Sequence, residues 1–271
     1  MKPRFPLLRF ELSAAYRGRT ALLFAFGFAL ASVGVALIGL APGGALAVQG
    51  FARTSVSLLQ LVLWVVPLLG LATGAIAGAE CHELELVAAL PLPRERIVLA
   101  RWAAWTVVLS ACLAIGFGAA GLVIGALAGA ADGMRYLALV GIAVVLVAAS
   151  LALGLWIGVV ARSRARAIAL AVVVWFVLAV GVDLVVIAAL AILPPREAGW
   201  GLSLLLLADP VDSARALGLG LFQADAIAGP TGAALKRVLG GWGAWLLVAG
   251  LAGWTALPLA LAGKRFARSD L

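Results

Sequence analysis

Six long apolar segments constrain the fold of this chain more than any other feature of its sequence. They cover residues 21–41, 56–79, 97–131, 136–160, 168–193 and 238–262. A membrane-spanning helix needs about 20 apolar residues, because the hydrocarbon core is about 30 Å thick and each helical residue rises about 1.5 Å. The segments are continuously apolar rather than alternating, which excludes a transmembrane β-barrel. The sequence therefore predicts an all-α polytopic membrane protein with six transmembrane helices.

Composition supports this class. Of the 271 residues, 65% are hydrophobic and 12% are charged, and the mean hydropathy is +1.17. A soluble domain cannot bury that much apolar surface. We interpret residues 1–271 as a single transmembrane domain.

Two regions depart from a simple series of spans. Segment 97–131 would measure about 52 Å as one helix, so it is expected either to project beyond the membrane or to bend near Gly116–Gly118. The alternative is two separate spans, which would reverse the orientation of everything after them; we treat the segment as one span. The connection 194–237 contains two apolar pieces, Leu202–Ala208 and Ala214–Phe222. Both are too short to cross, so they are expected to be re-entrant or interfacial helices.

Lysine and arginine residues predict the orientation. If the N-terminus is cytoplasmic, the inner segments hold fourteen of them and the outer segments hold six. Four of those six lie in the long connection 194–237, and long connections count least. Both termini and residues 80–96 are therefore expected in the cytoplasm, and 194–237 outside. The net charge of +8 is explained by orientation, so no nucleic-acid partner is expected.

The first twenty residues predict an interfacial helix. Apolar residues recur at helical spacing (Phe5, Leu8, Leu12 and Tyr16), with polar residues on the other side (Arg9, Ser13 and Arg17). This pattern is typical of a helix that lies in the plane of the membrane surface, and Pro6 is tolerated in its first turn.

Glycines at four-residue spacing predict close helix packing. They occur as Gly70, Gly74 and Gly78, as Gly121, Gly125 and Gly129, and as Gly154 with Gly158. Small residues at this spacing let two helix backbones approach each other. Glycine is common in membrane helices, so the pattern says little about a substrate.

The stretch from Glu80 to Arg96 is short, charged and flanked by apolar segments. It has four acidic residues, an apolar stripe that includes Leu84 and Leu86, and two prolines, Pro91 and Pro93, that end any helix. We interpret it as a short amphipathic helix across the cytoplasmic mouth of the bundle, with its charged face toward a water-soluble partner. The alternative is an ordinary solvated loop.

Several chemistries are excluded by absence from the sequence. No Gly-x-x-x-x-Gly-Lys-Ser/Thr motif occurs, so the chain cannot bind ATP through a P-loop of its own. The single histidine, His82, allows no catalytic triad. Cys81 and His82 lie between Glu80 and Glu83, but neighbouring residues on a helix point apart, so a metal site there is not favoured. We expect no enzymatic activity, cofactor or metal in this chain.

Asp183 is the one acidic residue deep inside an apolar segment. Such a group is costly in a membrane and usually faces a bundle interior or water. It could be a gate, a coupling group or a substrate contact. Alternatively it could fix packing through a hydrogen bond, with Gln60 or Thr73 as candidate partners, or lie near the outer surface.

Taken together, these features resemble the permeases of ABC-2-type transporters, of the type V exporter-like class. Those permeases carry Glu-x-Gly-Thr-Leu-Glu-Leu-Leu-Leu-x-x-Pro-x-x-Arg after the second span. Six residues here fit that motif, namely Glu80, Leu84, Glu85, Leu86, Pro91 and Arg94. His82 and Glu83 replace the Gly-Thr pair. The resemblance implies that Glu80, His82, Glu83, Leu84, Glu85, Leu86 and Arg94 form a coupling helix that contacts an ATPase.

The last third of the chain is similar to the permeases of NosDFY transporters, which serve maturation of the copper enzyme nitrous oxide reductase. The similar elements are Trp175-Phe176, Asp183-Leu184, the run from Leu207 to Asp212, Arg215, and the end Ser269-Asp270-Leu271. This resemblance implies a homodimer in the bacterial inner membrane. It also implies a NosF-like cytoplasmic ATPase dimer that binds ATP and Mg²⁺, and a NosD-like periplasmic partner. Segment 194–237, with Asp209, Asp212 and Arg215, would be the docking surface.

Two other functions fit the same sequence. One is an ABC-2 exporter of a lipid or another amphiphile, without a periplasmic partner. The other is a mechanotransmitter scaffold, in which ATP hydrolysis acts on a periplasmic protein and nothing crosses the membrane.

Overall fold

The computed structural model describes residues 6–16, 19–40, 47–80, 94–128, 133–192, 206–221 and 242–267. This part of the chain is almost wholly helical and contains no strand. Six helical stretches are long and apolar enough to cross a membrane, which confirms the predicted all-α polytopic class. They are α2 (Arg19–Leu40), α3 (Ala47–Glu80), α5 (Arg94–Ala128), α6 (Gly133–Ala161), the continuous unit α7–η1–α8, and α12 (Gly243–Ala267).

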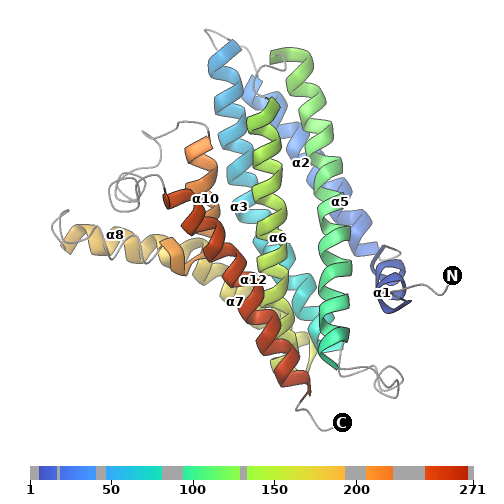
Figure 1. Ribbon diagram of the computed structural model, residues 1–271. Coiled ribbons are helices and arrows are strands. Elements are labelled where there is room, and N and C mark those ends of the chain that lie inside the picture. The colour runs from blue at the N-terminus through green and yellow to red at the C-terminus, as the bar shows by residue number, and fades with distance from the viewer. Residues whose placement is uncertain are drawn as a thin grey trace.

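The helices form a bundle with two distinct ends (Figure 1). Helix α1 (Pro6–Tyr16) lies at one end, together with the C-terminal ends of α3, α6 and α12 and the N-terminal ends of α2 and α5. We call this the α1 end. The opposite, or far, end holds the C-terminal ends of α2 and α5 and the N-terminal ends of α3 and α6.

Most helices extend beyond the apolar segments from which they were predicted. Helix α3 begins at Ala47 rather than at residue 56, and α12 continues to Ala267 rather than ending at residue 262. A helix satisfies its backbone hydrogen bonds internally, so it continues past the apolar part that hydropathy detects. Helix α5 is continuous over 35 residues, and charged residues such as Arg94 and Lys264 belong to helix ends.

Helices α3 and α6 pack through glycines that face each other. A Cβ added to Gly74 would lie 2.5 Å from the Leu151 carbonyl oxygen, and one added to Gly78 would clash with the carbonyl oxygen of Leu155. Reciprocally, Gly154 faces the carbonyl oxygen of Leu71. These neighbours are backbone atoms, which cannot rotate away. The close approach predicted from the glycine spacing therefore occurs here, and α3 and α6 form the centre of the bundle.

The glycine repeat on α5 has a different environment. A Cβ on Gly121 would lie 3.1 Å from the Tyr136 ring, whereas Gly125 has no atom within 4 Å. The side chain of Tyr136 fills the space beside α5, and its hydroxyl donates a hydrogen bond to the Phe117 carbonyl oxygen at 2.6 Å. Glycines at the same spacing thus bring the backbones of α3 and α6 together, whereas Gly121 and Gly125 of α5 do not contact another backbone closely.

The fifth span consists of three parts. Helix α7 (Arg164–Phe176) packs on α3 and α6, a π-helical turn η1 (Val177–Gly181) follows, and α8 (Val182–Ile192) continues. Figure 1 shows that α8 leans away from the bundle. Its apolar side chains, including Leu184 and Ile187, are consequently exposed within one chain.

The connection 194–237 contains α10 (Pro210–Leu221), preceded by helical residues 206–208. At 12 residues, α10 is about 18 Å long, too short to cross the membrane. It packs against α3, α6 and α12. Gly218 allows this contact, because a Cβ there would lie 2.6 Å from both methyl carbons of Leu59 on α3.

Candidate functional site

A buried arginine joins three helices at the α1 end. Arg101, on α5, donates from Nε and Nη2 to the two carboxylate oxygens of Glu11 on α1, at 3.1 and 3.2 Å. Its Nη1 donates to the carbonyl oxygen of Ala77 on α3 at 2.9 Å. Both charged side chains are buried. A buried, bidentate pair of this kind holds its helices in a fixed relation, since removing one partner leaves an uncompensated charge.

The Glu11–Arg101 contact shows which face of α1 packs against the bundle. Tyr16, which belongs to the apolar stripe predicted to face the membrane, is 72% exposed within the chain. The buried residues are instead Glu11 and Ala15, with Leu12 partly buried beside them. The sequence pattern did not indicate that Glu11 faces the bundle, where Arg101 compensates its charge. From the sequence, Arg101 was interpreted only as one of the charges that set the orientation in the membrane.

The predicted coupling residues fall mainly outside the described part of the chain. His82, Glu83, Leu84, Glu85 and Leu86 all belong to the stretch 81–93, which the structure does not describe. The two flanks of that stretch are described, since Glu80 is the last residue of α3 and Arg94 is the first of α5. Both flanks lie at the α1 end, within a few helical turns of Ala77 and Arg101.

Glu80 makes an ion pair at the same end of the bundle. Its Oε1 lies 3.3 Å from Nη2 of Arg164, the first residue of α7. Both side chains are substantially exposed, so the pair contributes less than about 1 kcal/mol to stability. Glu80 is thus accessible at the α1 end, whereas Glu11 is not.

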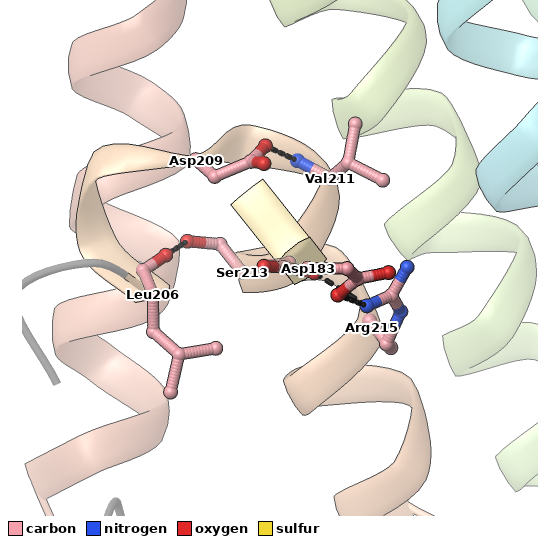
Figure 2. Close-up of polar contacts among 7 residues, drawn as sticks. Asp183, Leu206, Asp209, Val211, Ser213 and Arg215 are labelled. Atoms are coloured by element: carbon pink, nitrogen blue, oxygen red, sulfur yellow. Dashed lines mark hydrogen bonds and ion pairs between the residues drawn. The ribbon is translucent and has the colours of Figure 1, made fainter. Parts of the chain in front are cut away.

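A second polar cluster links α8 to α10. The carboxylate of Asp183 accepts a hydrogen bond from Nη1 of Arg215 at 2.6 Å, and Asp212 lies 2.7 Å from the same nitrogen. Figure 2 shows the Asp183 carboxylate pointing at the Arg215 guanidinium. The partners suggested from the sequence are wrong, because Asp183 pairs with Arg215 and the Thr73 hydroxyl donates to carbonyl oxygens of its own helix. Asp183 remains 43% exposed.

The Asp-Pro-Val-Asp motif, residues 209–212, forms the N-terminal cap and first turn of α10. Asp209 precedes the helix, and its Oδ1 accepts a hydrogen bond from the Val211 N–H at 2.7 Å (Figure 2). Pro210 is the first helical residue, where its missing N–H costs nothing. The Ser213 hydroxyl donates to the Leu206 carbonyl oxygen at 2.7 Å, which fixes the preceding residues. Asp209 is therefore an N-cap.

Two carboxyl groups near the start of α10, those of Asp209 and Asp212, have raised pKa values. Burial raises the pKa of Asp209 to about 7, helped by the charge of Asp212 and opposed by the N–H groups of Val211 and Asp212 and by Arg215. Burial also raises the pKa of Asp212 to about 6, against the opposing charge of Arg215. Burial lowers the pKa of Arg215, but the hydrogen bond to Asp183 and the neighbouring carboxylates outweigh this and raise it.

The three residues predicted to dock a periplasmic partner, Asp209, Asp212 and Arg215, all lie in this polar cluster. Asp209 and Asp212 are 1% and 5% exposed, and Arg215 is occupied by two carboxylates. Their side chains therefore organise α10 and its contact with α8 rather than presenting a surface. The three were predicted to be surface groups because nothing in the motif indicates that Asp183, more than twenty residues earlier, approaches them.

The junction before Asp183 contains a feature that the sequence does not signal. Trp175 donates from its indole nitrogen to the Trp64 carbonyl oxygen at 3.1 Å, and the two rings meet edge to face. This contact holds α7 on α3 immediately before η1. A π-helical turn inserts extra backbone, which changes the face on which later residues lie. The turn η1 therefore helps determine the direction in which the Asp183 side chain points.

Metal ligands do not gather in the described ranges. No group of three His, Cys, Asp or Glu side chains there could hold a metal ion. The two polar clusters are built from ion pairs and hydrogen bonds, which suits mechanical connection between helices.

Comparison with known proteins identifies the architecture. The family described as ABC-2 family transporter protein matches residues 60–271. The chain belongs to this family. It is 32% identical to the probable ABC transporter permease protein NosY of Pseudomonas aeruginosa, over 98% of both chains. It is also 30% identical to the probable NosY permease of Stutzerimonas stutzeri, over 80% of this chain and 81% of that one. The chain is thus an ABC transporter permease similar to NosY.

Proposed function

We propose that this permease couples ATP hydrolysis by a separate cytoplasmic ATPase to a periplasmic step in copper-site assembly of nitrous oxide reductase. The full-length likeness to NosY is the observation that carries this proposal. The chain would lie in the bacterial inner membrane with both termini in the cytoplasm. ATP and Mg²⁺ would be bound by the ATPase alone, since this chain has no P-loop.

The α1 end is the place where the ATPase would act. Helix α3 ends at Glu80 and α5 begins at Arg94 there, and Arg101 connects both of these helices to α1. A displacement of the coupling segment would therefore move α1, α3 and α5 together rather than bend one helix. Packed cores with two alternative arrangements convert such displacements into larger rearrangements.

The Asp183–Arg215 contact supports a route toward the periplasmic side. It connects the fifth span to α10, and α10 belongs to the connection 194–237. A change in the tilt of α8 would be passed through this ion pair to that connection. A periplasmic partner seated on 194–237 would then sense the state of the bundle.

The shape of the chain favours a second copy. Helix α8 leans away from its own bundle and exposes Leu184, Val185 and Ile187 (Figure 1). Packing against another membrane helix would hold α8 more firmly than lipid does, because close side-chain contacts drive helix association in membranes. We accordingly propose a homodimer in which α8 contributes to the interface.

Deletion of the gene from its host tests the proposal. The reductase should still be made and exported, but its activity and copper content should fall and return on complementation. Full activity and normal copper content in the deletion strain would refute the proposal. A change in membrane lipids or in an exported amphiphile, with normal reductase, would favour the exporter alternative.

A further inference from the structure

Helix α1 packs on α5 through Glu11, but beside this contact a groove of 480 Å³ is lined by residues of α1, α2 and α5. Its floor and walls are apolar and include Leu22 on α2 and Val107 and Ile115 on α5. Arg9 and Ser13 on α1 line the same groove. The groove therefore has an apolar body with polar groups at the α1 side.

The position of the groove determines which medium fills it. Helices α2 and α5 are both membrane-spanning, and α1 lies at their end (Figure 1). Leu22, Val107 and Ile115 are each more than half exposed within the chain, so the groove is open to the outside of the bundle. Exposed leucine, valine and isoleucine on a membrane-spanning helix face acyl chains rather than water.

The charge on α1 is directed toward the groove. Helix α1 contains two charged residues, Arg9 and Glu11. Glu11 is turned inward and neutralised by Arg101. Arg9 is exposed and has no ion-pair partner among the residues that the structure describes. One cation thus stands beside the apolar groove, and it complements a negatively charged ligand rather than a neutral one.

The dimensions suit a lipid. Val107 and Ile115 are eight residues apart on α5, which corresponds to about 12 Å along the helix. An acyl chain could follow this distance while its phosphate lies near Arg9 and the Ser13 hydroxyl. Basic pockets between membrane helices are suited to anionic head groups. The buried Glu11–Arg101 pair fixes α1 in place, so the groove is formed before any ligand binds.

We propose that the groove between α1, α2 and α5 is a binding site for one anionic phospholipid. The phosphate contacts Arg9 and Ser13, and one acyl chain packs on Leu22, Val107 and Ile115. This site does not depend on the function proposed above, since it rests on the groove and its charge alone.

Lipid retention measured by native mass spectrometry tests the proposal. The full chain is incubated with phosphatidylglycerol or with phosphatidylcholine of the same acyl chains, and bound lipid is counted. Wild type should retain phosphatidylglycerol preferentially. Arg9→Gln should reduce that preference about fivefold, the effect of losing one cation near an anionic head group, about 1 kcal/mol. Ile115→Trp should reduce retention of both lipids, because it fills the apolar groove.

The control variant is Arg166→Gln, which removes an exposed cation at the α1 end but outside the groove. It should retain phosphatidylglycerol like wild type. Equal retention by Arg9→Gln and wild type would overturn the proposal. A photoreactive amino acid introduced at Ile115 identifies the occupant directly. Crosslinks to phospholipid support the site, and crosslinks to a second copy of the chain overturn it.

Discussion

Replacing Gly158 with alanine should separate the two central helices of the bundle. A Cβ on Gly158 would clash with the Ala75 carbonyl oxygen and lie 2.7 Å from the Ala79 nitrogen and 2.8 Å from the Gly78 Cα. All three are backbone atoms of α3, so no side chain can rotate to relieve the contact. Helix α3 must then move back by roughly 1 Å, which loosens packing along the whole α3–α6 contact.

The cost can be isolated with a matched control on the same helix. Gly141 also lies on α6, but nothing approaches its Cβ position within 4 Å. Both substitutions gain up to about 1 kcal/mol from the higher helix propensity of alanine. The difference between Gly158→Ala and Gly141→Ala therefore measures the clash alone. Overpacking of this kind costs about 1–3 kcal/mol, so Gly158→Ala should be less stable than Gly141→Ala by that amount.

The assay is reversible unfolding of the purified chain in mild-detergent micelles titrated with sodium dodecyl sulfate, followed by circular dichroism. The two variants are compared by their unfolding free energies under identical conditions. Equal stability of Gly158→Ala and Gly141→Ala would refute the packing described for α3 and α6.

Three further predictions concern orientation and the α8–α10 cluster. With Cys81 and Cys112 replaced by serine, a cysteine at Ser163 should be labelled only from the cytoplasm and one at Met134 only from the periplasm; the opposite result would contradict the orientation. Asp183→Asn should leave permease abundance unchanged but impair reductase maturation, whereas normal maturation would reduce Asp183 to a packing role. The pKa of Asp209 is raised from 3.8 to about 7, so between these values the folded chain keeps a proton that the unfolded chain has lost. The free energy of unfolding should therefore fall by about 3 kcal/mol as pH rises from 5 to 8. Asp209→Asn, which keeps the N-cap, should remove most of this pH dependence in the same unfolding assay; an unchanged slope would contradict the assigned cause.

The sequence predicted the membrane class and the six spans because apolar length is a local property. Each span needs only its own residues to be recognised, and the glycines of α3 and α6 signalled their close packing in the same way. Helix ends were less predictable. Residues 47–55 are helical although their composition is mixed, since hydropathy detects the membrane and not the hydrogen-bonded helix.

The polar contacts could not be predicted because they join residues distant in sequence. Glu11 meets Arg101 across 90 positions, and Asp183 meets Arg215 across 32. Each residue alone suggested a surface charge or an isolated buried group. Only the fold brings the opposite charges together, and the π-helical turn before Asp183 has no recognisable sequence signature.

ATP turnover of the permease–ATPase complex in proteoliposomes tests the central claim most directly. The flank of the coupling segment at Glu80 is exposed at the α1 end, so Glu80→Arg combined with Glu85→Arg should lower co-purification of the ATPase and reduce turnover to that of the ATPase alone. Asp132→Arg, the same charge reversal in the connection between α5 and α6, should leave both unchanged. Unaltered binding and turnover in the double variant would contradict coupling through this end of the bundle.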